Sequence, residues 1–581
     1  MVNITGMISI SSQRKNFYIY FFIFIFALIL RNYYLWEIKD TYVFPLLLGD
    51  AKSYEVWAQD ISKGEWIGNQ VFYQAPFYPY FLATIYSLVG RNLFAVRLIQ
   101  ILLGATACLL VARAGRYFFS NKVGISSGLL LAVYPTAIFF DCLIQKAVLN
   151  FFFMALLLLL LGKIKDRPSG KLWFLCGLTL GSFGLTRENA LILIIPIGAW
   201  LLIHFRFQDR KKILVWCTFF LMGLSTILLP VAIRNKIVGG DLLFTTSQFG
   251  TNLYIGNHES ASGMYEPLRP GRGNWKFERE DATALAQKDI GHKLSPKEVS
   301  RYWTQKTLSY IQSNPGGWLH LMVKKWLLFW NFMEISDTES QYAYYEWSSL
   351  LKGLGSFLHF GIIAPLAVLG ICVTLKDYRK LWLLYLVLII FAASVTLFYI
   401  FDRYRHPIIP LLVLFSAAGL THGYRLIQRK EVKMLMIWGL ITLAAGIGIN
   451  WKIIPQDQQH FRSLTLGNMC FEFLASGNAQ QAVKYCTQSA RINPHNAKVL
   501  NNLGAGLIEQ RKFEEAIPFL LQAVKLNPQI AKAHFNLGVA LAYLGKPEAA
   551  LGYFEQALRI NPGFEKAARW RKKILKDSDP F

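Results

Sequence analysis

Several ionisable residues interrupt otherwise apolar stretches of this chain, and they are the first candidates for chemistry. Asp50 lies in LLLGDAKSYEVWAQDI, between three leucines and the aromatic residues Tyr54 and Trp57. Burial beside aromatic rings would raise the pKa of this carboxyl group toward that of a useful general base. An aspartate that begins a helical run also serves as an ordinary helix N-cap. Both roles are open for Asp50 on the sequence alone.

Three short turns carry the other candidates. Their residues are Asp141 and Lys146 in the first turn, Arg187 and Glu188 in the second, and Asp402, Arg403, Tyr404, Arg405 and His406 in the third. The planar guanidinium fork of arginine matches phosphate oxygens, so these cations predict an anion-binding site. Each turn also has a structural explanation, either contact with lipid head groups or an ion pair between neighbours such as Asp141 and Lys146.

The elements that position these residues are expected to be membrane spans. The chain has 581 residues, 54% hydrophobic and 17% charged, whereas soluble domains are typically about 45–50% apolar and about 25% charged. This composition excludes a disordered chain and predicts a polytopic membrane protein. Eleven apolar runs are long enough to cross a bilayer, and they must be helical because lipid satisfies no backbone polar group. They centre on 17–30, 93–112, 123–140, 145–162, 171–185, 189–205, 213–232, 355–375, 381–400, 407–424 and 434–452.

The charges of the connecting loops set the orientation of these spans. Five loops are rich in Lys and Arg, and with eleven spans all five lie on the same side as Arg14 and Lys15. The positive-inside rule makes this side cytoplasmic. Residues 76–90 are apolar but short, and a crossing there would turn the N-terminus away from the basic loops. We therefore expect 76–90 to be an interfacial or re-entrant helix within the first outer loop, residues 37–92.

With this topology every candidate residue faces outward, together with a long outer loop at residues 234–350. The formal net charge of +26 would otherwise suggest a nucleic-acid partner. Because most of it belongs to the cytoplasmic loops, the charge is mainly a topology signal. We therefore expect no nucleic-acid binding.

The C-terminal residues 456–581 have the pattern of a repeat array. Asn-Pro recurs at 493–494, 527–528 and 561–562, a period of 34 residues. Gly504 and Gly538 keep this period, with Cys470 in the remaining slot. The pattern resembles the tetratricopeptide repeat (TPR), whose helix pairs need small residues where they touch. We expect three repeats at about 463–496, 497–530 and 531–564, followed by a capping helix.

Two of the seven cysteines lie where the helices of the first repeat meet. They are Cys470 and Cys486. In an oxidising compartment they can form a disulfide, and two small buried apolar residues are the equal alternative. No two cysteines form a CxxC pair, and seven cysteines in 581 residues are not a disulfide framework.

At these residues the sequence resembles the type-C (GT-C) glycosyltransferases, membrane enzymes that take sugars from polyprenyl-phosphate carriers. It is most similar to the branch that contains the protein O-mannosyltransferases and the aminoarabinose transferases of lipid A. Together with the spans, the matching segments cover residues 15–455. They are GDAKSYEVWA, QAPFYPYFLATIYSLVGRNLFAVRLIQILLG, LAVYPTAIFFD, GLTRENALILIIP and RYRHPIIPLLVLFSAAGL.

The resemblance implies roles for particular residues. Asp50 matches the essential aspartate that the family carries in its first outer loop. Arg187, Arg403 and Arg405 are implied to bind the carrier phosphate, and we add Lys146 to this donor-phosphate site. Many relatives have an acid near the start of the fourth span, where this chain has Gln145 and Lys146, so no second catalytic acid is carried over. Secondary candidates are Asp141, Glu188, Tyr404 and His406.

We expect an all-α fold, with a bundle of about eleven spans in residues 1–455 and a TPR α-solenoid in 456–581. The expected function is inverting transfer of a sugar from a polyprenyl-phosphate carrier to a hydroxyl of a protein or envelope glycolipid, with Asp50 as base. No cofactor is assigned, and a divalent metal stays open. The expected location is the inner (plasma) membrane, with a cytoplasmic N-terminus and an extracytoplasmic or periplasmic tail. The expected partners are the lipid-linked donor, the bilayer and a protein that binds the TPR array.

Two other functions stay open. One is an O-antigen ligase or polymerase, which would depend on His258 or His292 in the long outer loop and not on Asp50. The other is a transporter or a non-catalytic TPR scaffold. A transporter more readily shows inverted repeats and broken helices within its spans, and a scaffold does not need the outer arginine-rich turns.

Overall fold

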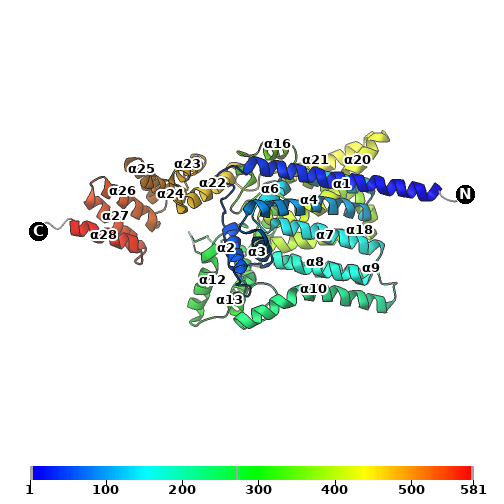
Figure 1. Ribbon diagram of the computed structural model, residues 1–581, viewed down its shortest axis with the longest axis horizontal. Coiled ribbons are helices and arrows are strands. Elements are labelled where there is room, and N and C mark those ends of the chain that lie inside the picture. The colour runs from blue at the N-terminus through cyan, green and yellow to red at the C-terminus, as the bar shows by residue number, and fades with distance from the viewer. Residues whose placement is uncertain (1–3, 270–271, 274, 578–581) are drawn as a thin grey trace. The chain divides into compact units, whose positions relative to one another are not determined.

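Helices are the only regular elements that the computed structural model contains among the residues it describes, 4–269, 272–273 and 275–577 (Figure 1). This confirms the expected all-α fold class. The chain divides into two compact units, the first made of Met1–Asp40, Gly49–Asp337 and Trp347–Ile453 and the second of Thr41–Leu48, Thr338–Glu346 and Ile454–Phe581. Two short segments from the outer loops thus belong to the same unit as the C-terminal array.

The first unit contains the helices on which the expected spans fall and the helices that connect them. These are α1 (Ile4–Ile38), α2 (Asp50–Ser62), α3 (Phe77–Val89), α4 (Leu93–Phe118), α5 (Asn121–Ala132), α6 (Pro135–Cys142), α7 (Ala147–Asp166), α8 (Gly170–Thr186), η1 (Glu188–Leu193), α9 (Ile194–His204), α10 (Arg210–Gly239), α11 (Phe249–Gly256), α12 (Trp275–Ile290), α13 (Pro296–Ser313), α14 (Pro315–Trp330), α16 (Ser349–Phe357), α17 (Phe360–Thr374), η2 (Leu375–Asp377), α18 (Tyr378–Thr396), α19 (Asp402–Arg405), η3 (His406–Ile408), α20 (Ile409–Gln428) and α21 (Val432–Ile449). Polar side chains start several of them, because the first backbone N–H groups of a helix need acceptors. Asn92 caps α4, and Ser169 caps α8.

The number of spans differs from the expectation. Within the described residues, seven helices or helix runs are long and apolar enough to cross a membrane, or up to eight if the bent pair α5–α6 is one span. About eleven spans are therefore not confirmed. The remaining expected spans fall on α8, which has 17 residues, on the short η1–α9 run, and within Ser349–Thr396, which forms one apolar run where we expected two spans. An apolar sequence shows that a segment avoids water, but it does not show where the helix bends or stops.

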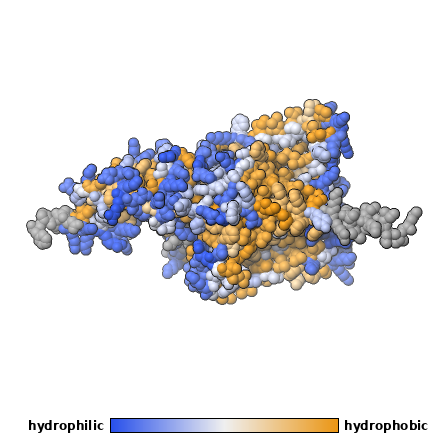
Figure 2. All heavy atoms as spheres, turned by 45° about the horizontal axis from the view of Figure 1, so that its top comes forward, coloured by the Kyte–Doolittle hydropathy of each residue, from blue (hydrophilic) through white to orange (hydrophobic). Residues whose placement is uncertain are grey.

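The surface of the first unit is strongly apolar. Large hydrophobic side chains remain exposed on α1, α10 and α21, among them Phe22, Leu221 and Leu440. Figure 2 shows a broad hydrophobic area on one face of the first unit. Monomeric soluble proteins rarely expose contiguous apolar patches of this kind, whereas lipid-facing helices require them. The finding supports a multipass membrane protein.

Two glycines let α8 and α10 pack unusually closely. A Cβ atom added to Gly177 would lie 2.1 Å from the carbonyl oxygen of Phe220, and one added to Gly223 would lie 2.1 Å from that of Phe174. Small residues allow such backbone contact between membrane helices. The contact fixes α8, whose C-terminal end carries Arg187.

The second unit contains the repeat array. Its helices are α15 (Gln341–Tyr344), α22 (Gln458–Ala475), α23 (Ala479–Ile492), α24 (Ala497–Glu509), α25 (Phe513–Leu526), α26 (Ala531–Tyr543), α27 (Pro547–Ile560) and α28 (Glu565–Asp577). Each successive pair from α22 to α27 corresponds to one expected repeat, and α28 is the expected capping helix. The short loops between paired helices make them antiparallel neighbours.

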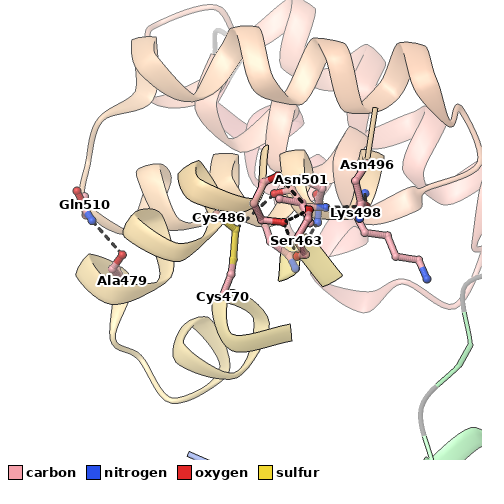
Figure 3. Close-up of a disulfide and its surroundings, with 11 residues drawn as sticks. Ser463, Cys470, Ala479, Cys486, Asn496, Lys498, Asn501 and Gln510 are labelled. Carbon is pink, nitrogen blue, oxygen red and sulfur yellow. Dashed lines mark hydrogen bonds between the residues drawn. A yellow bond between two sulfur atoms is a disulfide. The ribbon is translucent and has the colours of Figure 1, made fainter. Parts of the chain in front are cut away.

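The same two positions close the helix pair in all three repeats. In the second and third repeats a glycine faces a large side chain, since a Cβ on Gly504 would lie 2.4 Å from Leu520 and one on Gly538 would lie 2.7 Å from Phe554. In the first repeat the equivalent positions are Cys470 and Cys486, which form a disulfide (Figure 3). The covalent bond therefore takes the place of the glycine and large-side-chain contact.

Candidate active site

Asp50 begins α2 and points its carboxylate at two other segments of the first unit. Gly49 precedes it with φ of 53°, a left-handed backbone conformation that favours glycine. The Nε2 atom of Gln74 donates to Oδ1 of Asp50 at 3.2 Å, and Nη1 of Arg403 donates to Oδ2 at 2.6 Å. The N-cap of α2 is Gly49, and the helix has no side-chain cap. The carboxylate of Asp50 is thus used in side-chain contacts.

Arg403, on α19, bridges two carboxylates. Its Nη1 contacts Asp50, and its Nη2 lies 2.5 Å from Oδ2 of Asp337. Burial is the largest single influence on Asp50 and would raise its pKa, but Arg403, together with Lys146 and Gln74, holds the pKa below its ordinary value. Burial and the negative charge of Asp50 raise the pKa of Asp337, despite its contact with Arg403. The single positive charge of Arg403 is therefore shared by the carboxylates of Asp50 and Asp337.

The chain before Asp337 is tied to α19 by several contacts. The backbone N–H of Asp402 donates to the carbonyl oxygen of Ile335 at 2.9 Å. Arg405 pairs with Glu334 at 2.6 Å and donates to the carbonyl oxygens of Phe329, Asn331 and Met333. Both partners of this ion pair are almost fully buried. Arg405 therefore positions the end of the long outer loop, and with it Asp337.

Arg187 is a buried cation with a different environment. It is 7% exposed, has no ion pair among the residues that the structure describes, and its Nε atom has no hydrogen-bond partner there. Its guanidinium carbon lies 4.1 Å from the centre of the Tyr404 ring. Burial lowers its pKa to about 10, so it remains cationic at neutral pH. Its neighbour Glu188 accepts hydrogen bonds from Thr246 and Gln248.

Lys146 and Tyr54 complete this part of the site. Lys146 precedes α7. Burial is the largest influence on its pKa and lowers it, and the charges of Glu188, Arg403, Asp50 and Arg187 act on it as well. The Tyr54 hydroxyl is buried without a hydrogen-bond partner among the described residues, and Asp50 acts on it electrostatically. Buried polar groups without partners are rare and need an explanation. A polar ligand would provide one for both Tyr54 and Arg187.

Two of the secondary candidates lie elsewhere in the bundle. Asp141, on α6, pairs with Arg31 of α1 at 2.7 Å, and both side chains are fully buried. A Cβ on Gly104 of α4 would overlap the Asp141 carboxylate, so this glycine makes room for the ion pair. His406 stacks on Phe151 with ring centres 4.6 Å apart. Neither side chain contacts Asp50 or Arg187 in the described structure, so both are packed within the helix bundle.

The structure adds a carboxylate that the sequence did not single out. Glu278, on α12, accepts a hydrogen bond from the Tyr73 hydroxyl at 3.0 Å and one from the Tyr265 hydroxyl at 3.1 Å. Burial and the charge of Asp50 raise its pKa to about 7. Its segment, KFEREDATALAQKD, carries several acids and offers no signal that distinguishes this one. The sequence around Asp337, EISDTES, likewise contains several acids and does not single out this one.

The histidines of the long outer loop take part in local contacts. His258 stacks on Tyr254 with ring centres 5.4 Å apart, and Nδ1 of His292 lies 2.9 Å from the carbonyl oxygen of Lys293. Within the described residues, no group of three His, Cys, Asp or Glu side chains is arranged to hold a metal ion.

Comparison with protein families gives two matches. Residues 73–230 match the family described as dolichyl-phosphate-mannose-protein mannosyltransferase, and residues 502–563 match the tetratricopeptide repeat. None of the curated proteins compared with the chain matches it. The first match includes Lys146, Arg187 and Glu188, and it ends before Glu278.

Similar solved structures fall into the same two groups. The apo oligosaccharyltransferase of Archaeoglobus fulgidus is 13% identical, with a TM-score of 0.44 over 86% of this chain and 59% of that one. The AglB oligosaccharyltransferase of the same organism, in complex with an inhibitory peptide and a dolichol-phosphate, is 14% identical, with a TM-score of 0.43 over 81% of this chain and 60% of that one. The first TPR domain of human RPAP3 is 25% identical, with a TM-score of 0.19 over 20% of this chain and 90% of that one.

The family matches confirm the two resemblances recognised in the sequence. The chain spans less than two thirds of the oligosaccharyltransferases, and the protein mannosyltransferase match covers only its residues 73–230. The chain thus combines a segment similar to the dolichyl-phosphate-mannose-protein mannosyltransferases with a C-terminal tetratricopeptide array.

Proposed function

We propose that this protein is a membrane glycosyltransferase that transfers a sugar from a polyprenyl-phosphate carrier to an acceptor hydroxyl. The family match supports a transferase of lipid-linked sugars. The observation that carries the proposal is the arrangement of charges in one cluster. Arg187, which is buried and has no ion pair among the residues that the structure describes, lies near Tyr404, while Asp50 is held in place by Arg403 and Gln74. Such a cluster offers an anion site beside a fixed carboxylate.

We assign the carrier phosphate to Arg187 and Lys146. Arg403 is shared by Asp50 and Asp337, and Arg405 is satisfied by Glu334 and three backbone carbonyls. Arg187 and Lys146 have no ion pair among the described residues. A buried cation without a partner gains most from an anionic ligand. Positioned cations also stabilise the charge that develops on a departing phosphate.

Asp50 engages the acceptor. Its carboxylate accepts a hydrogen bond from the acceptor hydroxyl and orients the oxygen toward the anomeric carbon. In-line attack forms the bond from the acceptor oxygen to that carbon while the bond from the carbon to the phosphate oxygen breaks and the hydroxyl proton passes to a carboxylate of the site, so the sugar is transferred with inversion. The electron pair leaves with the polyprenyl phosphate, which Arg187 and Lys146 hold. The acceptor is a hydroxyl of a protein or of an envelope glycolipid.

The array in the second unit would recruit a protein to the enzyme. The Nδ2 atom of Asn468, on α22, donates to the backbone carbonyl oxygen of Thr338 at 3.0 Å. Asparagines recur at the equivalent positions 502 and 536. This contact supports binding of an extended polypeptide through its backbone. The disulfide in the first repeat supports an extracytoplasmic location of the array, because such bonds persist in oxidising compartments.

The direct test is a donor panel. The purified protein would be incubated with polyprenyl-phosphate hexoses and pentoses and with acceptors that carry hydroxyl groups. We expect release of polyprenyl phosphate from at least one donor, together with an acceptor that gains the sugar in inverted configuration. Sugar transfer with retention would exclude the single in-line step. Absence of transfer with every donor would refute the assignment as a lipid-linked sugar transferase.

A further inference from the structure

Two consecutive residues connect Asp50 with the second carboxylate, Glu278. Gln74 donates to Asp50, and Tyr73 donates to Glu278. The two carboxylates belong to α2 and α12, more than two hundred residues apart in the sequence. The charge of Asp50 also acts on Glu278, so the two acids, each contacted by a residue of the first outer loop, lie in one part of the first unit.

The surroundings of the two carboxylates differ. Asp50 shares the Arg403 guanidinium with Asp337, so its negative charge is balanced by a direct ion pair. Glu278 has no ion pair with a cation among the described residues, and its two oxygens accept hydrogen bonds from the hydroxyls of Tyr73 and Tyr265. Arg279 faces the ring of Tyr73 at 5.9 Å and not the Glu278 carboxylate. Glu278 is therefore an acid held by neutral donors beside two other acids.

This difference decides which group takes up a proton more readily. Arg403 favours the charged form of Asp50 and lowers its pKa, which weakens it as a base. Burial and the charges of Asp50 and Asp337 favour the neutral form of Glu278, and the two tyrosine hydrogen bonds oppose them only in part. The resulting pKa of about 7 is near the value that general acid–base catalysis favours at neutral pH.

We propose that Glu278 is the proton acceptor of the transfer reaction and that Asp50 orients the acceptor hydroxyl. The inference rests on the proposed function. As the acceptor oxygen bonds to the anomeric carbon, its proton passes to the Glu278 carboxylate, and the electron pair of the broken carbon–oxygen bond leaves on the carrier phosphate. The long outer loop, which also carries Asp337 and Tyr265, thus supplies a catalytic residue to a site shared with the first outer loop and the short outer turns.

The test is the pH profile of kcat/KM in the full-length protein. In the wild type we expect kcat/KM to fall as the pH drops below about 7, because Glu278 must be deprotonated to accept a proton. Glu278→Gln should lose this dependence and lower kcat/KM by about 10²-fold or more. Glu280→Gln changes an exposed acid on the same helix and should behave as the wild type.

Two further variants should shift the acidic limb of the pH profile, the fall of kcat/KM at low pH, in opposite directions. Asp50→Asn removes a charge that raises the pKa of Glu278, so the fall should begin at lower pH. Tyr265→Phe removes a hydrogen bond that lowers this pKa, so the fall should begin at higher pH. A purely structural role for Glu278 would change activity without these shifts.

The outcomes separate the two proposals. Wild-type transfer with an unchanged rate and profile in Glu278→Gln would overturn the assignment of Glu278 and leave the proposed function intact. Loss of the limb in Asp50→Asn and its retention in Glu278→Gln would also overturn the assignment, since Asp50 would then be the base. A wild-type protein that transfers no sugar would refute the proposed function and the inference with it.

Discussion

At the residue scale, the candidate cations have different surroundings although they look alike in the sequence. Arg403 and Arg405 differ by two positions, yet one joins Asp50 to Asp337 and the other is enclosed by Glu334 and backbone carbonyls. Arg187 has no such partner among the described residues. An arginine that is paired with carboxylates of the protein holds these groups in position, whereas an arginine without such partners is available to bind an anionic ligand.

Arg187→Gln should therefore weaken donor use without unfolding the protein. The variant keeps a polar side chain but loses the charge that we assign to the carrier phosphate. We expect kcat/KM for the lipid-linked donor to fall by about 10²-fold, the size found when one oxyanion-stabilising donor is removed. Steady-state kinetics at several donor concentrations would measure it.

Arg301→Gln is the matched control, because Arg301 lies exposed on α13. It should leave donor kinetics unchanged. Equal effects of the two substitutions would point to a loss of general positive charge, and an unaffected Arg187→Gln would remove Arg187 from the phosphate site.

The sequence could identify some site residues and not others for a physical reason. Asp50, Lys146, Arg187 and Arg403 stand out because a charge that interrupts an apolar stretch is costly. Glu278 and Asp337 lie in a polar loop, where an acid costs nothing and carries no signal. Their roles depend on contacts with Tyr73 and Arg403, which are distant in the chain. Nor does the sequence show that Asp141 pairs with Arg31.

At the element scale, the repeats show how well a periodic pattern predicts structure. The 34-residue period gave three helix pairs and a capping helix, because each repeat meets the same packing constraint at the same two positions. Spans were less predictable. The run 123–140 bends by 57° between α5 and α6, and hydropathy contains no information on that bend. In the sequence this bend is indicated locally by Pro135, which stands at the start of α6.

The packing equivalence of the first repeat leads to a stability prediction. Reduction, or Cys470→Ser with Cys486→Ser, should loosen α22 and α23, since a disulfide that closes a loop of this length contributes about 3 kcal/mol. Cys470→Gly with Cys486→Leu recreates the contact of the second repeat and should recover part of the loss. Amide hydrogen exchange in α22 and α23 would report both effects.

In this experiment α26 and α27 serve as an internal reference, because the third repeat lacks the disulfide. Their exchange should stay the same in every variant. Unchanged exchange in α22 and α23 after reduction would show that the disulfide does not stabilise the repeat. Equal loss in the serine and the glycine–leucine variants would refute the packing equivalence.

At the scale of the whole molecule, catalysis and recruitment are assigned to different units. The candidate active site lies in the first unit, and the asparagine positions 468, 502 and 536 lie in the second. Asn502→Ala with Asn536→Ala should raise KM for a protein acceptor about tenfold and leave transfer to a small hydroxyl acceptor unchanged. Paired assays with the two acceptors would test this, and an equal loss with both would contradict separate roles.

The central claim is that sugar transfer depends on the carboxylate of Asp50. The most direct measurement compares release of polyprenyl phosphate and acceptor glycosylation by the wild type, by Asp50→Asn and by Asp60→Asn, an acid on the same helix outside the site. We predict a loss of about 10²-fold or more in Asp50→Asn, with folding retained, and wild-type transfer in Asp60→Asn. Transfer by folded Asp50→Asn at the wild-type rate would contradict the account.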